Sequence, residues 1–529
     1  MIAAFWTFAL FTLGLAAVVA RGDEPSVDAF FAGDHISRIE IRLVDGAADR
    51  LREDPRGYAP CSLTIDGDAI HDDVAIKLKG FAGSFQDLDG KPGFTVNMDR
   101  FRPGRRFHGL DKFHLNNSAQ DPTFLHELLG SRLFLEAGIP AARVAHAHVF
   151  LDDRDLGLYV LKEAIDHEFL ERHFDDASGN LYDGGKAVDL DELLERDEGK
   201  NGVPGADLKA LVAASHLEDP AERQTAIDER LDVSSFITFM ALELMSGHWD
   251  GYTTAHNNYR VYVDPASGGR VRFLPHGMDQ LFGDPAAPIL EMPPTIVAGA
   301  VMQVPAWREA FRGRVRELLP LFDANERLLP LVDAEAQRLR PAVTAIGDDA
   351  LAAWEESIAD LRDRLSARDE QLRMQADAAE PEPVQFDGGR RAMLAGWSPR
   401  IDTGEAHLEE SEGEDGRRRY SIVISGEAPC IASWRVAVPL PAGTYSFQGL
   451  ARGEGIEATT DESGAGAGLR ISGGTRTDQI DREGTWTSLG HEFTLEAPAT
   501  VELIAELRAT AGRVDFNAES LVLVRLTEP

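Results

Sequence analysis

The sequence predicts an α+β protein in which a strand-rich lobe leads into a helical lobe and a separate β-sandwich follows. Strands come first, then one helix, two more strands and a long helical stretch. Residues 376–392 form a linker rich in proline, acid and glycine. Short β-like runs with turn residues about every ten positions come after it. We therefore expect one domain at residues 30–375 and a sandwich at residues 393–529.

Residue patterns justify the elements of the strand-rich lobe. Ile39, Ile41 and Leu43 alternate, which is typical of a half-buried strand. Asp121-Pro122 predicts a helix start, with an acid at the cap and proline at the first position. The strand that contains Ile39 is expected at residues 35–44. Further strands are expected at residues 61–65, 74–79, 94–98, 144–151 and 156–161, and a second helix at residues 166–174.

The helical lobe is expected from about residue 190 to residue 375, interrupted by a hairpin. Residues 301–374 are dominated by Leu, Ala, Arg and Glu, all good helix formers. Beyond the linker, strands are expected at residues 420–425, 432–440, 443–451, 468–472, 491–495 and 500–507.

Composition and charge narrow the class of partner. The chain has 529 residues, too many for one ordinary core. Its net charge is −36, from 89 acids against 53 bases. Such a field repels nucleic acid, so we expect no nucleic-acid partner. The same negative charge would make a divalent cation useful for binding the substrate if that substrate is a phosphate.

The N-terminus predicts export. Residues 2–20 are almost uninterruptedly apolar, and Val18 and Ala20 fit the small-residue pattern of a signal-peptidase site. We expect a signal peptide at residues 1–20 and a periplasmic, cell-surface or secreted protein. Because no positive side chain precedes the apolar run, an uncleaved membrane anchor stays open. Cys61 and Cys430 are too far apart in the chain to suggest a bridge, and both are expected to be buried.

The segment from His248 to Gly283 carries the strongest chemical signal. It places Asp250, Asn257, Asn258 and Asp279 within about one hairpin. One carboxylate can orient a nucleophilic hydroxyl, while an amide and a second carboxylate hold Mg²⁺ against phosphates. Acids and amides also gather in turns because they bond to nearby backbone, so a decorated turn is the alternative.

Four motifs in order resemble the CotH kinase family, named for spore-coat protein H. They are FHGLDKFHLNNSAQDPTFLHELLGSRLFLEAGIP, GLYVLKEAIDHEFLERHF, GNLYDGG, and WDGYTTAHNNYRVYVD with RVRFLPHGMDQLFG. The resemblance spans residues 35–375. It implies a bilobal, atypical protein-kinase-like fold.

The resemblance assigns roles at the hairpin. Asp250 matches the acid that would activate the acceptor hydroxyl. Asn258, or else Asn257, matches the amide that would ligate the metal, and Asp279 matches a second ligand. The implied cofactor is Mg²⁺ or Mn²⁺, with ATP as co-substrate. Many relatives carry two acids after the proline here, whereas this chain has Gly277 two residues before Asp279.

The resemblance also implies a nucleotide-binding set in the strand-rich lobe. Lys91 is the preferred candidate for the lysine that binds the nucleotide phosphates, and Lys79 is the second candidate. The alternative for either residue is a solvated lysine in a loop. Glu127 is expected to steady that lysine, unless it is a plain surface glutamate. Glu163 is expected at a hinge beside the adenine ring, unless it caps the next helix.

Two functions follow. The preferred one is an exported kinase that transfers the ATP γ-phosphate to a hydroxyl of an extracellular or envelope protein. The alternative is a catalytically inactive kinase-fold protein in surface adhesion or coat assembly. The sandwich resembles a carbohydrate-binding jelly roll, and Trp434 and Trp486 could stack on sugars or fill the core.

Overall fold

The computed structural model describes residues 30–31, 35–68, 70–378, 384–388, 390–413, 416–426, 428–458, 466–474, 480, 484–495 and 499–526. The chain divides into two compact units, Met1–Ala376 and Asp377–Pro529. The expected signal peptide, residues 1–20, lies outside the described residues. Among the described helices, none has the length and apolar character needed to cross a membrane.

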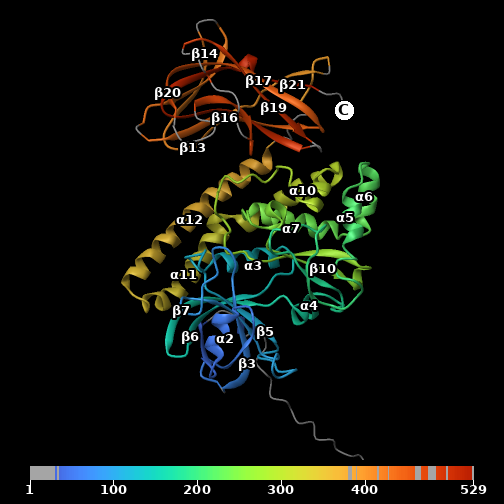
Figure 1. Ribbon diagram of the computed structural model, residues 1–529, viewed down its shortest axis with the longest axis vertical. Coiled ribbons are helices and arrows are strands. Elements are labelled where there is room, and N and C mark those ends of the chain that lie inside the picture. The colour runs from blue at the N-terminus through green and yellow to red at the C-terminus, as the bar shows by residue number, and fades with distance from the viewer. Residues whose placement is uncertain are drawn as a thin grey trace, which may run out of the picture. The chain divides into compact units, whose positions relative to one another are not determined.

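The first unit begins with a closed barrel of seven strands in the order β1-β2-β3-β4-β5-β7-β6 (Figure 1, blue to teal). Strand β1 closes it by pairing antiparallel with β2 and parallel with β6. Ile39 and Ile41 point into the barrel and are fully buried. The strands are β1 Ser37–Leu43, β2 Ala59–Ile65, β3 His71–Lys79, β4 Gly93–Asn97, β5 Lys112–Asn116, β6 Val144–Leu151 and β7 Arg154–Glu163, with helix α2 at Ala47–Glu53.

Helix α3, His126–Glu136, starts later than Asp121-Pro122 predicts. The Asp121 carboxylate accepts hydrogen bonds from the backbone N–H of Thr123 and of His126, both at 2.9 Å. Asp121 thus holds a tight turn, in which Phe124 has φ 63°, and the helix begins only after it. The N-terminal part of the expected helix is wrong, because the capping acid closes a turn first.

A mixed region follows the barrel, so the unit is α+β. Its four-stranded sheet has the order β11-β10-β8-β9. Those strands are β8 Leu181–Asp183, β9 Glu195–Glu198, β10 Tyr259–Asp264 and β11 Arg270–Pro275. The helices are α4 His167–His173, α5 Lys209–Ser215, α6 Pro220–Asp228, α7 Val233–Met245, α8 Tyr252–Ala255, α9 Ile296–Met302, α10 Pro305–Leu318, α11 Leu329–Thr344 and α12 Asp348–Asp377.

Helix α7 is the centre of this region's core. The Asp232 side chain caps it by accepting from the Ser235 N–H at 2.9 Å. Phe236 and Phe239 of α7 pack on Phe273 of β11, with ring centroids 4.7 and 5.7 Å apart. This packing holds α7 against the β10–β11 hairpin. Asp250 follows the end of α7, and Asp279 follows the end of β11.

The second unit is built from strands that share one hydrophobic core. Strand β20 is long and changes partners at Gly512, which has φ 122°. Before that glycine it pairs with β16 and β18, and from the glycine onward it pairs with β15, while β17 pairs with residues on both sides of it. The strands are β12 Arg391–Met393, β13 Ser398–Thr403, β14 His407–Glu412, β15 Arg418–Ile424, β16 Cys430–Leu440, β17 Gly443–Ala458, β18 Gly466–Ile471, β19 Thr487–Leu495, β20 Ala499–Asn517 and β21 Val522–Arg525.

Both cysteines are free and buried, each in the core of its own unit, as the sequence predicts. Trp434 is also a core residue at 5% exposure, and its indole N–H donates to the Ser421 carbonyl at 3.2 Å. Trp486 is half-buried, with the guanidinium groups of Arg419 and Arg452 within 5.6 and 5.3 Å of its ring centroid.

Candidate functional site

A buried ion pair joins the barrel to α3. Lys162, near the end of β7, places its Nζ 2.9 and 2.7 Å from the two carboxylate oxygens of Glu127. The side chains are only 2% and 3% exposed. Glu127 was expected to hold Lys91 or Lys79, so that pairing is corrected. Lys162 lies in the strand LYVLKE. A charged side chain within this otherwise apolar, buried run is the sequence feature that could have drawn attention to Lys162.

Lys79 ends β3 close to this pair. Its ammonium donates to Asn116 Oδ1 of β5. Burial and the positive charge of Lys162 lower the pKa of Lys79 to about 8, against the opposing effect of Glu127 and Asp279. Lys79, Lys162, Glu127 and Asp279 therefore form one electrostatic cluster across the barrel and the helical region.

Asp279 follows β11 and is held against α3. The imidazole Nδ1–H of His126 donates to the Asp279 carbonyl at 2.9 Å. A Cβ on Gly130 of α3 would lie within 2.8 Å of the sulfur of Met278, so α3 packs directly on this segment. Burial, and then the Glu127 charge, raise the pKa of the Asp279 carboxyl. A cation beside Asp279 would relieve that cost.

The amides predicted from the sequence do meet Asp250. Its carboxylate accepts from Asn258 Nδ2 at 2.7 Å and from Asn257 Nδ2 at 3.1 Å. The Asn257 amide oxygen accepts from the Ala187 N–H at 3.2 Å, so it is already engaged. The Asn258 oxygen instead points at Gly277. Of the two amides, Asn258 has the oxygen better placed for a ligand.

Gly277 sits where a side chain has no room. Its φ is 55°, and a Cβ there would lie 2.3 Å from Asn258 Oδ1 and 2.5 Å from Asn258 Cγ. The Gly277 carbonyl also accepts from His248 Nε2 at 3.2 Å. An acid at this position would therefore require Asn258 to move.

His276 does not take the place of the absent acid as a charged metal ligand. Burial, with the charges of Arg260 and Lys162 next, lowers the pKa of His276 well below its usual range. The ring is therefore neutral, and a neutral imidazole is a poor Mg²⁺ ligand.

Lys91 and Glu163 lie outside this cluster of contacts. The Lys91 ammonium lies 5.0 Å from the ring centroids of Phe124 and Tyr159, and burial lowers its pKa to about 8. Glu163 is fully buried, and its carboxylate is bound by Arg143 and Arg172. Those two guanidinium groups outweigh burial and lower the pKa of Glu163. Both carboxylate oxygens of Glu163 are thus engaged by arginine side chains.

Comparison with known proteins adds the following. The family model described as CotH kinase protein matches residues 76–372. The chain is 23% identical over 255 residues to spore coat protein homolog 1 of Rhizopus delemar, covering 43% of this chain and 42% of that protein. It is 25% identical over 187 residues to invasin CotH7 of the same fungus, covering 32% and 31%. It therefore spans less than half the length of these fungal relatives.

Inner spore coat protein H of Bacillus subtilis is 21% identical over 269 residues, covering 47% of this chain and 73% of that protein. Among solved structures, TmCBM61 in complex with β-1,4-galactotriose is 12% identical, covering 25% of this chain and 89% of that one at a TM-score of 0.18. The xylan-binding module CBM15 is 14% identical, covering 26% and 97% at a TM-score of 0.19. At these TM-scores the likeness supports no conclusion about a ligand.

Proposed function

The chain belongs to the CotH kinase protein family, and we propose that its first unit is a bilobal kinase-like domain that uses ATP and a divalent metal to phosphorylate a protein hydroxyl. The observation that carries this proposal is the buried Lys162–Glu127 pair beside Asp279. Protein kinases likewise need a lysine–glutamate pair and a metal-binding acid in place together. Here the barrel supplies the lysine, and α3 supplies both the glutamate and the support for Asp279.

The cationic part of the cluster suits nucleotide phosphates. Glu127 holds the Lys162 ammonium at one position. Because the lysine side chain is already ordered, phosphate binding would cost less conformational entropy. Lys79 adds a second ammonium, positioned by Asn116. Phosphate oxygens near these groups would restore the proton that burial disfavours on Lys79.

The oxygen ligands suit a hard cation. Asp279 and the Asn258 amide oxygen would hold Mg²⁺ or Mn²⁺, since both ions prefer oxygen ligands. The metal, when bound, would neutralise charge on the transferring phosphate. The Asp250 carboxylate would accept the proton of the acceptor hydroxyl, and the amides of Asn257 and Asn258 orient it for that task.

Gly277 favours a second candidate, a kinase-fold protein without catalysis. The acid that relatives place there is absent, and Asn258 occupies the space it would need. Similar proteins are called invasins and spore coat proteins, so this candidate is adhesion or coat assembly at a cell surface. In either case we propose an exported protein, with an extracellular or envelope protein as partner and the second unit as a carbohydrate-binding module.

Thermal unfolding of the full chain tests the nucleotide site. Because ATP and metal complete each other's binding site, the two together should stabilise the first unit by more than the sum of either alone. Asp279→Asn and Lys162→Met should abolish that excess. Asp153→Asn is the control, since its side chain is 99% exposed. Equal shifts in Asp279→Asn and the unmodified protein would contradict the proposal.

A further inference from the structure

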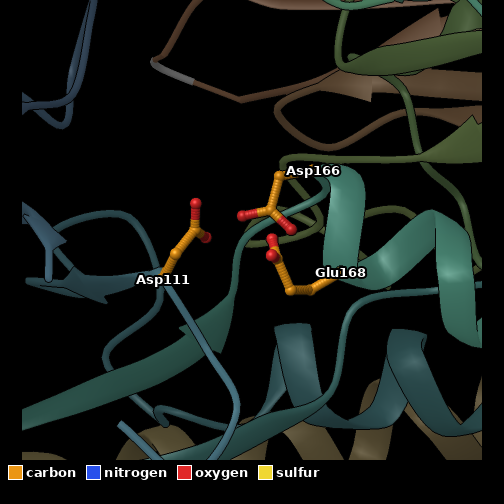
Figure 2. Close-up of side chains that lie close together, drawn as sticks. All are labelled: Asp111, Asp166 and Glu168. Carbon is orange, nitrogen blue, oxygen red and sulfur yellow. The ribbon is translucent and has the colours of Figure 1, made fainter. Parts of the chain in front are cut away.

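Three carboxylates meet at a place separate from the Asp250–Asp279 site. Asp111 directly precedes β5, while Asp166 and Glu168 come from the cap and first turn of α4. One oxygen of each lies within 4.8 Å of the others. Figure 2 shows the three side chains pointing toward a common centre. We call them the acidic triad.

The triad holds buried oxygen atoms that lack hydrogen-bond partners. Asp166 is only 2% exposed. Its Oδ1 accepts weakly from the Phe169 N–H at 3.4 Å, but its Oδ2 has no hydrogen-bond partner. Asp111 Oδ1 and Glu168 Oε2 are buried in the same way without hydrogen bonds. Buried polar atoms are nearly always satisfied, so three buried carboxylate oxygens without hydrogen bonds in one cluster point to a missing cationic partner.

The positively charged side chains near the acidic triad do not neutralise its negative charge. Lys112 Nζ lies 3.8 Å from Asp166 Oδ2, beyond hydrogen-bond reach, and Arg106 pairs with Glu168. Two positive charges thus face three carboxylates. Burial raises the pKa of Asp166 well above its usual range; Lys112 opposes this rise, while the Asp111 charge and a side-chain hydrogen bond with Asp111, available once Asp166 is protonated, add to it. The Asp111 charge also contributes to a raised pKa at Glu198.

We propose that Asp111, Asp166 and Glu168 bind a divalent calcium ion, with water completing the shell. Carboxylate oxygens without nitrogen or sulfur ligands select a hard cation. Two oxygens on one Ca²⁺ can be separated by up to roughly 5 Å, about twice the Ca²⁺–oxygen distance, whereas Mg²⁺ limits them to about 4 Å. The three oxygens all lie within 4.8 Å of one another, so they can share one Ca²⁺ without rearrangement.

Such an ion would join two parts of the first unit. Strand β5 belongs to the barrel, whereas α4 follows the segment that leaves the barrel after β7. Bound calcium would tie Asp111 at the start of β5 to the start of α4. It would thereby stiffen the connection between the barrel and the helical region, without contacting the residues proposed to bind ATP.

Calcium titration of the chelator-treated full-length protein tests this site, read as the melting temperature of the first unit. Micromolar-range Ca²⁺, on the order of the affinities of sensor-type sites, should raise that temperature by a few degrees, and Mg²⁺ at equal concentration by less. Asp111→Asn and Asp166→Asn should lose the response. Asparagine retains helix capping, so Asp166→Asn removes the charge and keeps the cap.

Asp219→Asn is the matched control, because Asp219 caps α6 with bonds to the N–H groups of Ala221 and Glu222 and is outside the triad. It should respond to calcium like the unmodified protein. Asp250→Asn and Asp279→Asn should also keep the response, which separates this site from the proposed ATP–metal site. The proposal would be overturned if Ca²⁺ does not raise the melting temperature of the unmodified protein. It would also be overturned if Ca²⁺ still raises that temperature in Asp111→Asn and Asp166→Asn.

Discussion

The Lys162 ammonium contacts both oxygens of Glu127, at 2.9 and 2.7 Å, in a place where neither side chain exceeds 3% exposure. Breaking such a pair leaves one charge buried alone. We expect Lys162→Met or Glu127→Leu to destabilise the first unit by about 3–5 kcal/mol. Lys162→Met combined with Glu127→Leu should recover much of that loss, because no charge is left unpaired. Denaturant unfolding measures this, and additive losses in the double variant would contradict it.

Gly277 and Asn258 should be energetically coupled. Gly277→Asp is expected to cost about 1–3 kcal/mol, because its side chain would overlap Asn258 Oδ1 and Cγ. In an Asn258→Ala background those atoms are gone, so the cost of Gly277→Asp should fall. Gly283→Asp is the control, since nothing lies within 4 Å of a Cβ there. A double-mutant cycle with no coupling energy would show that the contact is unimportant.

Lys91 should make stability depend on pH. Among the described residues its ammonium has only ring contacts, with Phe124 and Tyr159. Burial lowers its pKa from 10.5 to about 8, so the folded state holds fewer protons than the unfolded state between those values. The free energy of unfolding should therefore rise with pH across this window, relative to Lys91→Met.

Lys91→Met also measures how much the buried charge of Lys91 lowers the free energy of unfolding. Below pH 8 the lysine is charged in both states, and Lys91→Met should be more stable on the order of 1–3 kcal/mol. The difference should shrink as pH rises toward 10.5. Unfolding measured at several pH values checks this, and a difference that is constant over the window would refute the assigned cause.

The two tryptophans of the second unit should behave differently. Trp434 is buried against Tyr420, with ring centroids 4.7 Å apart, so Trp434→Ala should cost about 3–5 kcal/mol. Trp486→Ala should cost clearly less, because the ring is half-buried and meets two arginines. If this unit binds sugar through Trp486, binding to a polysaccharide panel should vanish in Trp486→Ala while the unit stays folded. Unfolding curves and binding isotherms distinguish these effects.

Periodicity predicted most elements because burial alternates along strands and repeats along helices. Ile39 and Ile41 identified β1, and the helix expected at residues 166–174 is α4, which begins after its cap Asp166. Residue type alone could not place the start of α3, since the Asp121 carboxylate can cap a helix or close a turn.

The site was harder to predict, because its contacts join residues distant in the chain. Asp250 and its amides lie within a few residues of each other and could be recognised from spacing. The partner of Glu127 is 35 residues away, and the apolar run around Lys162 does not by itself show which acid the lysine meets. The overlap at Gly277 depends on two loop backbones meeting, which no sequence pattern encodes.

Phosphoryl transfer is the most direct test of the proposed activity. The full-length protein would be incubated with γ-labelled ATP, Mg²⁺ or Mn²⁺ and a generic protein acceptor, beside Asp250→Asn, Asp279→Asn and the surface control Asp153→Asn. We predict label on protein with the unmodified chain and the surface control, and at least a hundredfold less with either site variant, in keeping with loss of a catalytic base. Incorporation equal to that of the two site variants, in a protein that still binds ATP, would contradict catalysis and leave the non-catalytic candidate.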